Sequence, residues 1–520
     1  MRNRKTEVHT GQGLYRHENH KKPVTRRDFL AAGLTSGLGI AVGPSLVGLL
    51  TGSNDAYAAA GSCGGAVSTG GAGRIPFICF DLAGGSNIAG SNVLVGLKEQ
   101  TDLLDDAGNR KLGIADSMSP RIDPAQINTS LGLKFHSQSA LLAGINFTLA
   151  RDPVLQALVL ANTDGCVICA RSNDDTSNNP HNPMYAIGKS GSKGQLVTLI
   201  GSSNTVSGGN SVAPPNQIDA TMRPTKIATA NDTKGLVDTG KLSSLLGSPD
   251  SIKVMESIER LSAAKGGKIG DTEIVKGILG CAYSGSTEKA SQFSNPFVLS
   301  PVGGGTPVIP VDPNVAKVFD VVNGNIADGD FMKTAAIMKL VVQGYAGAGT
   351  IQMGGFDYHT GKRGDGDLKD LKAGKAIGAV LAYAAANNKP VMIYVFSDGA
   401  VSSNGTPDDA AGGKLVWTSD NGTCAATFFL VYNPTGKPQL ANKAGVAQRQ
   451  LGKYKATGSV DTAAQPFSNN VVQLAEVVAL NYLALHGQVG KFGQVVPAQG
   501  LGPSTTWDNY AMFAPIVPVV

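Results

Sequence analysis

One stretch, residues 349–404, constrains the fold more than any other part of the chain. It alternates between apolar runs and polar loops. Residues 350–353 and 391–396 are predicted as strands. A helix over 367–386, with Asp365 or Asp367 as its N-cap, is predicted between them because apolar residues recur there at three- and four-residue steps. The second strand, VMIYVF, is apolar on both faces, which is typical of a parallel sheet covered by helices. The stretch therefore predicts a strand–helix–strand unit of an α/β fold.

Polar side chains follow both of these strands. Asp357 and His359 lie in the loop after the first strand, and Asp398 follows the second. A crossover helix between parallel strands places both loops at the same edge of the sheet, where ligands of open α/β sheets bind. Carboxylates and imidazole are common metal ligands, so the sequence predicts a metal site at this edge.

Two earlier loops carry further candidate residues. Residues 74–80 form the first predicted core strand, which ends at Asp81 before a Gly-Gly pair that lets backbone approach a ligand closely. The alternative is a carboxylate that caps a turn. Residues 166–170 form a second buried strand, and the polar loop after it ends near His181. The alternative there is a plain surface loop.

The N-terminal 58 residues have the pattern of an export signal. Arg26-Arg27 precedes a weakly hydrophobic, glycine-rich run over 31–50, and Ala-Tyr-Ala at 56–58 matches a small-x-small cleavage site. This pattern resembles a twin-arginine signal. It predicts export by the twin-arginine translocase, cleavage near Ala58, and a periplasmic or extracellular protein. Glycines and a proline interrupt the run, so no stable membrane span is expected in the mature chain.

Charge and composition exclude one class of partner. Residues 1–58 hold eight of the 44 Lys and Arg and four of the 39 Asp and Glu, so 36 and 35 remain elsewhere. No basic stripe with interleaved aromatics remains, which argues against nucleic acid. Residues 200–248 are rich in Ser, Thr, Gly, Asn and Pro, which indicates an inserted lobe. The predicted division is a core over 59–199 and 314–520, with a lobe and linker over 200–313.

The order of these motifs resembles a known family. The chain has a twin-arginine leader, a first strand ending in Gly-Gly, and an Arg-Ser…His loop. A G-x-D-x-H loop, a long helix, a strand ending in Ser-acid and an S-D-N-G-T segment at 419–423 follow in that order. This order is similar to a large, mostly uncharacterised bacterial family, exported by the twin-arginine route, within the alkaline phosphatase/sulfatase-like superfamily. The similarity covers most of residues 74–490 and is patchy between 200 and 315.

The resemblance implies a fold and a set of metal ligands. The fold is an alkaline-phosphatase-like mixed, mostly parallel sheet flanked by helices, with a two-metal site at its carboxyl edge. The ligands implied are Asp81, Asp357, His359, Asp398 and Asp420. The chain departs from the family at Asn421 and Gly399, where relatives or phosphatases carry histidine. The remaining oxygen-rich set suits Mn²⁺, Mg²⁺ or Ca²⁺ better than a Zn²⁺ pair.

The nucleophile is not assigned by a clean motif. The superfamily uses Ser, Thr or a modified Cys at the start of a helix, and Ser86, Thr176 and Ser177 are candidates by position alone. His181 would orient an oxyanion or serve as an extra ligand. Two interpretations follow from the resemblance. One is a metal-dependent hydrolase of a small phosphate or sulfate ester. The other is a catalytically inactive relative with a secretion, cell-surface or binding role.

Overall fold

The structure is a computed structural model of the 520-residue chain. It describes residues 73–173, 179–229, 312–321, 326–361, 363–441 and 449–517, and a few single positions between 232 and 260. The export signal, Thr176, Ser177 and nearly all of residues 230–311 lie outside the described residues. The predictions made for those segments stay predictions.

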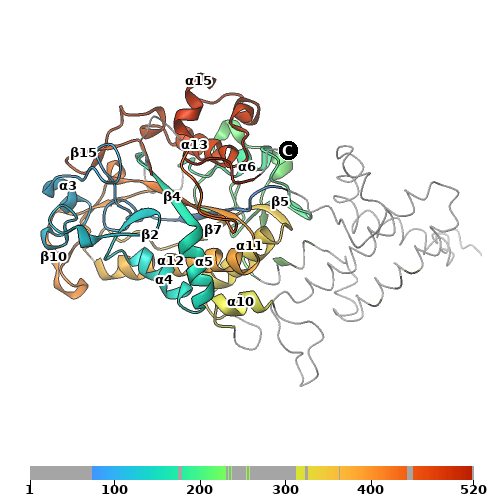
Figure 1. Ribbon diagram of the computed structural model, residues 1–520, viewed down its shortest axis with the longest axis horizontal. Coiled ribbons are helices and arrows are strands. Elements are labelled where there is room, and N and C mark those ends of the chain that lie inside the picture. Colours follow the sequence, from blue (N-terminus) through green and yellow to red (C-terminus); the bar gives the residue numbers. More distant parts are fainter. Residues whose placement is uncertain are drawn as a thin grey trace, which may run out of the picture. The chain divides into compact units, whose positions relative to one another are not determined.

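A sheet of eight strands forms the centre of the described unit (Figure 1). Its spatial order is β14-β4-β13-β8-β1-β7-β5-β6. As far as the structure describes the sheet, β13 alone runs antiparallel to its neighbours β8 and β4. The strands are β1 (Phe77–Leu82), β4 (Thr163–Ile168), β5 (Val197–Gly201), β6 (Thr225–Lys226), β7 (Ala346–Met353), β8 (Val391–Ser397), β13 (Thr427–Tyr432) and β14 (Gln450–Leu451). The predicted α/β class with a mixed, mostly parallel sheet is confirmed.

Helices cover both faces of this sheet (Figure 1). One layer holds α4 (Ala140–Leu149), α5 (Pro153–Asn162), α10 (Pro313–Val318), α11 (Gly329–Val342) and α12 (Arg363–Ala386). The other holds α6 (Met184–Lys189), α13 (Val471–Ala484), α14 (Phe492–Val495) and α15 (Ser504–Trp507). Every residue of β8 is buried, as expected for a strand with helices on both sides.

Two glycines set how closely α12 and α4 approach each other. A Cβ at Gly144 would lie 2.1 Å from the carbonyl oxygen of Leu371, and one at Gly374 would lie 2.0 Å from that of Leu141. Contacts this short are not made by real side chains, so both positions require glycine for the helices to pack at this separation. The backbones of α4 and α12 therefore lie directly against each other.

The predicted strand–helix–strand unit is present as β7, α12 and β8. Its two strands do not pair with each other, because β1 lies between them and pairs in parallel with both. The expected N-cap is wrong, since α12 begins at Arg363 and Asp365 and Asp367 lie inside it. Asp367 instead accepts hydrogen bonds from Arg363 Nε at 3.0 Å and Lys414 Nζ at 2.7 Å.

The start of the predicted inserted lobe belongs to the sheet. β6 pairs in parallel with β5 at the sheet edge, with Ile200 opposite Thr225. The core therefore continues past residue 199. Shorter strands lie outside the main sheet, and the pairs are β2 (Ile127–Leu131) with β3 (Leu133–His136), β9 (Val401–Ser402) with β12 (Ser419–Asp420), β10 (Pro407–Asp408) with β11 (Lys414–Leu415), and β15 (Tyr454–Lys455) with β16 (Ser459–Val460).

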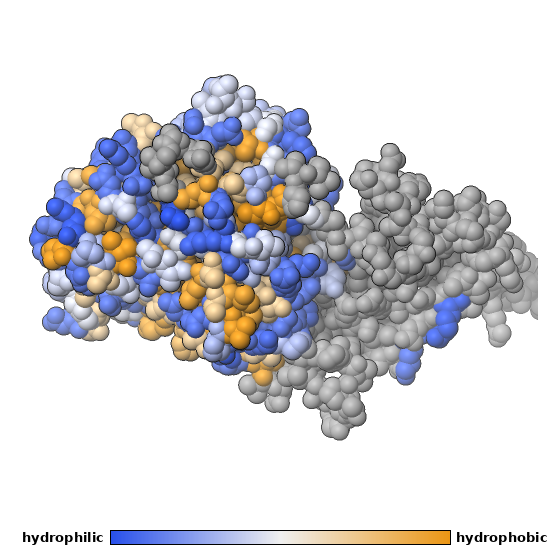
Figure 2. Space-filling model, in the orientation of Figure 1, coloured by the Kyte–Doolittle hydropathy of each residue, from blue (hydrophilic) through white to orange (hydrophobic). Residues whose placement is uncertain are grey.

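The surface is mixed in polarity (Figure 2). Hydrophobic side chains gather in the region of α5, where Val154 and Leu158 are exposed. Among the described residues, no helix combines the length and apolar character needed to cross a bilayer.

Candidate metal centre

The loops after β1, β7 and β8 meet at the carboxyl edge of the sheet. Gly84 N donates to Asp398 Oδ1 at 2.8 Å, and Phe356 N donates to the Ala83 carbonyl oxygen at 3.0 Å. Gly84 has φ +121°, and a Cβ there would lie 2.5 Å from Asp357 N. Glycine at position 84 is thus required for the loop after β1 to lie against two neighbours. These are the carboxylate of Asp398, which follows β8, and the backbone of the loop after β7.

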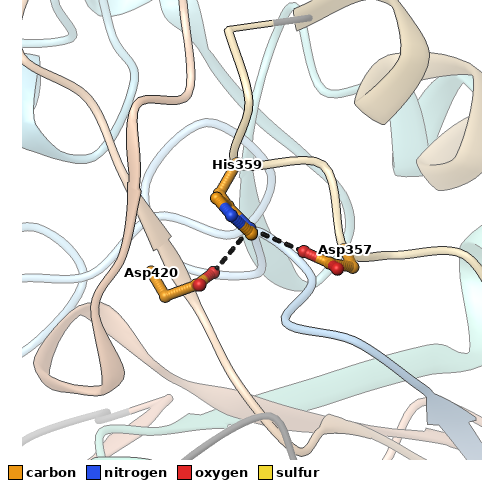
Figure 3. Close-up of side chains that lie close together, drawn as sticks. All are labelled: Asp357, His359 and Asp420. Atoms are coloured by element: carbon orange, nitrogen blue, oxygen red, sulfur yellow. Dashed lines mark ion pairs between the residues drawn. The ribbon is translucent and has the colours of Figure 1, made fainter.

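Three of the predicted ligands converge at this edge (Figure 3). His359 Nδ1 lies 2.6 Å from Asp357 Oδ1 and 3.0 Å from Asp420 Oδ1. One ligand atom from each residue lies within 4.8 Å of the others. The side chains are 57%, 31% and 46% exposed for Asp357, His359 and Asp420, so the cluster faces solvent. We call these three residues the carboxylate–imidazole cluster.

The imidazole nitrogen at the centre of the cluster has unusual surroundings. His359 Nδ1 is itself buried, and among the described residues it has no hydrogen-bond partner despite its short distances to both carboxylates. Both contacts have ion-pair distances without hydrogen-bond geometry. The three residues offer one imidazole nitrogen and two carboxylate oxygens within 4.8 Å of one another, which is a donor set that could hold a cation.

Asp420 reaches the cluster through a short hairpin. β12 pairs antiparallel with β9, which places Asp420 opposite Val401 in the loop region that follows β8. Asn421 N donates to the Ala400 carbonyl oxygen at 2.7 Å. The Asn421 side chain caps the next turn, where its Oδ1 accepts from Thr423 N at 3.2 Å and Thr423 Oγ1 at 2.7 Å. Asn421, which stands where the resemblance would imply a histidine, therefore caps a turn.

Tyr358, between the two ligands of the second loop, anchors that loop to the core. Its side chain is buried, its hydroxyl accepts from Asn87 N at 2.6 Å, and it donates to Asp370 Oδ1 at 3.0 Å. Asp370 also accepts from Asn92 Nδ2 at 2.7 Å. Burial raises the pKa of Asp370 to about 7 despite these hydrogen bonds. Successive side chains of this loop point in alternate directions. Tyr358 therefore points inward, and Asp357 and His359 face outward.

Asp81 and Asp398 form a separate, fully buried pair. Asp398 Oδ2 accepts from Asn210 Nδ2 at 2.7 Å, in addition to the bond from Gly84. Asp81 Oδ2 accepts from Asn210 N at 2.7 Å and Ser211 N at 2.8 Å. Burial raises the pKa of Asp81 to about 7, and the neighbouring charge of Asp398 contributes to the rise.

The predicted five-ligand site is thus divided. Among the described residues, the carboxylate–imidazole cluster is the one set of three or more acidic, His or Cys side chains whose ligand atoms lie together, and Asp81 and Asp398 are not members of it. Their oxygens are instead occupied by donors from residues 210–211 and Gly84. Sequence reasoning missed Asn210 and Ser211, because they lie in a polar stretch without periodicity.

The described nucleophile candidate does not face the cluster. Ser86 is buried, and its Oγ lies 3.4 Å from both Tyr358 Oη and Asp370 Oδ1, so it belongs to the anchoring network. The expected catalytic role of Ser86 receives no support from this placement.

His181 is also buried away from the cluster. It stacks on Phe396 with ring centroids 5.7 Å apart, and its Nε2 lies 3.5 Å from Ser172 Oγ. Its Nδ1 has no partner among the described residues. Burial lowers the pKa of His181 to about 3, so the ring is neutral at physiological pH. Ser172 Oγ and Asn179 Nδ2 each donate to the Asp398 carbonyl oxygen at 2.6 Å, which ties this loop to β8.

Comparison with known protein families, curated proteins and solved structures finds no match for this chain. The assignment of the site therefore depends on its geometry and chemistry.

Proposed function

We propose that the chain binds one divalent cation at the carboxylate–imidazole cluster and hydrolyses a small phosphate or sulfate ester there. The observation that carries the proposal is the convergence of Asp357, His359 and Asp420 from two separate loops on one solvent-facing point. The neighbouring Gly-rich loop and the anchored Tyr358 hold this arrangement in place.

The donor set fits a catalytic type of metal site. Two carboxylates and one imidazole suit Mn²⁺ or Zn²⁺, since imidazole is a weaker ligand for Mg²⁺ and Ca²⁺. Three protein ligands leave coordination positions open, as in catalytic rather than structural sites. A bound cation would supply Lewis-acid polarisation of an ester oxygen and lower the pKa of a water molecule. The three protein residues would hold the cation and leave its other coordination positions open to substrate.

A second candidate function is metal-dependent binding without turnover. The placement of Ser86 and His181 in buried networks favours it, because neither of these candidates faces the cluster. This alternative corresponds to an inactive relative with a secretion, cell-surface or binding role. It shares the metal site with the first candidate and differs only in catalysis.

Elemental analysis and an ester assay test both candidates. The protein purified from its own host is expected to carry about one equivalent of metal, and Asp357→Asn is expected to carry much less. Chromogenic phosphate and sulfate esters then separate the two functions. Turnover that disappears with the metal supports the hydrolase, and metal without turnover supports the binding protein. Wild-type protein that takes up neither Mn²⁺ nor Zn²⁺ would exclude both. Asp409→Asn, at an exposed acid on another turn, is the matched control.

We also propose that the chain is exported by the twin-arginine translocase, on the basis of the Arg26-Arg27 pattern. Replacing both arginines by lysine is expected to leave the full-length precursor in the cytoplasm. Cell fractionation followed by immunoblotting measures this. Unchanged export of the double variant would exclude the route.

A further inference from the structure

A surface pocket lies away from the residues of the carboxylate–imidazole cluster. It has a volume of about 360 Å³ and lies between the 3-10 turn η4 (Pro215–Gln217), the first turns of α13 and the segment before α15. Its lining is Pro215, Asn216, Asn470, Val472, Gln473, Glu476, Ala498 and Gly500. This volume is within the range of pockets that hold small molecules.

Glu476 is the buried residue of this lining. Glu476 is only 1% exposed, whereas the other lining residues are exposed or half-buried. Glu476 Oε2 accepts one hydrogen bond, from Gly500 N at 2.8 Å. No basic side chain among the described residues pairs with it, and burial raises its pKa to about 7. Ionising a buried carboxylate that has one backbone donor and no cationic partner is costly. A bound ligand with a positive charge would supply the partner that Glu476 lacks among the described residues.

Two other amide side chains of the pocket, those of Asn216 and Gln473, each offer an acceptor. Asn216 Nδ2 donates to the Ala498 carbonyl oxygen at 3.5 Å, and Gln473 Nε2 donates to that of Gly500 at 3.1 Å. In the described part of the chain, neither amide oxygen accepts a hydrogen bond in return. These oxygens add to the acceptor character that Glu476 provides.

The helix end in the pocket does not offer an anion site. The Asn470 side chain caps α13 by accepting from Val472 N at 2.9 Å and Gln473 N at 3.2 Å. The backbone donors that would otherwise bind an anion are therefore already occupied. Next to the lining, Gln217 is 1% exposed, and both polar atoms of its side chain lack a partner among the described residues.

We propose that this pocket binds a small organic cation, a primary amine or a guanidinium compound, with its charged group on Glu476. The amide oxygens of Asn216 and Gln473 would accept the other donors of the ligand. The pocket uses none of the residues assigned to ester hydrolysis, so this inference is independent of the proposed function.

Calorimetric titration of the full chain tests the pocket, with agmatine and n-butylammonium as probes and 1-butanol as the neutral control. Agmatine is expected to bind at least tenfold more tightly than 1-butanol. Glu476→Gln keeps an acceptor for Gly500 N and removes the charge, so agmatine affinity is expected to fall about tenfold or more. Asp409→Asn is the control for loss of an exposed acid and is expected to bind agmatine as wild type does.

A second variant keeps the test decisive if Glu476→Gln does not fold. Ala498→Tyr adds a ring to an exposed lining residue and is expected to weaken agmatine binding at least as much, without altering any charge. Equal binding of agmatine and 1-butanol, or unchanged agmatine affinity in folded Glu476→Gln or Ala498→Tyr, would overturn the proposal. So would Ca²⁺ binding that is lost in Glu476→Gln while agmatine does not bind.

Discussion

Two groups of acidic side chains lie at the same edge of the sheet, and they differ in what surrounds their oxygens. Asp81 and Asp398 are buried, and backbone and amide donors occupy their oxygens. Asp357 and Asp420 face solvent, and an oxygen of each points to one imidazole nitrogen. Carboxylates that already accept hydrogen bonds hold loops together, whereas the exposed carboxylates beside His359 are the ones that we propose as cation ligands. Aspartates at one sheet edge thus have different surroundings, and we expect different roles for them.

The largest expected effect is on stability, at Asp398. Asp398→Ala removes the acceptor for Gly84 N and Asn210 Nδ2 in a buried place, and we expect a loss of about 3 kcal/mol of unfolding free energy. Urea denaturation followed by circular dichroism measures it. Asp420→Ala, at the exposed cluster, is the matched variant and should change stability by about 0.5 kcal/mol or less. Equal losses in the two variants would remove the distinction between the groups.

The next effect is on metal affinity, at His359. His359→Ala is expected to weaken Mn²⁺ or Zn²⁺ binding about 100-fold or more, because it removes the donor that both carboxylates face. Equilibrium dialysis with metal analysis measures it. Asp81→Asn, in the buried pair, should bind metal as wild type does. Metal loss in Asp81→Asn would mean that the two groups form one site.

Raising the pH should lower the unfolding free energy of the protein through the buried pair of Asp81 and Asp398. The pKa of Asp81 is raised to about 7 in the folded chain, above its ordinary value near 4, so the folded state holds the proton more tightly than the unfolded state. Its contribution to stability is complete below about pH 4 and is progressively lost as the pH rises to 7. The unfolding free energy of Asp81→Asn should lack this component. If the unfolding free energies of the wild type and of Asp81→Asn changed with pH in the same way, this prediction would be contradicted.

The smallest effect is expected at Tyr358. Tyr358→Phe keeps the buried ring and removes the hydroxyl that bonds to Asn87 N and Asp370. Because the loop would then hold its two ligands less firmly, metal affinity should fall about tenfold, with about 1 kcal/mol of lost stability. Tyr185→Phe, whose hydroxyl bonds to the Val206 carbonyl oxygen, is the control for losing a tyrosine hydrogen bond elsewhere. Unchanged metal affinity in Tyr358→Phe would show that the hydroxyl does not position the ligands.

The sequence predicts the layers of the fold better than the partners of its site. Apolar runs such as residues 391–396 are buried on both faces, and this pattern is local, so β7, α12 and β8 are correctly expected. The convergence of Asp357 with His359 also follows from their positions after one strand. The division of the carboxylates does not follow, because it depends on Asn210 and Ser211, and nothing near them in the sequence indicates that they return to β1. Long-range hydrogen bonds of this kind leave no periodic signal.

The central position of β1 has a consequence for biogenesis. β1 is the first strand of the sheet to leave the ribosome, yet both of its neighbours come from far later in the chain, with Phe77 opposite Ala348 on one side and Met392 on the other. The middle of the sheet therefore cannot close until synthesis has passed residue 397, and β1 lacks at least one of its two neighbours until then.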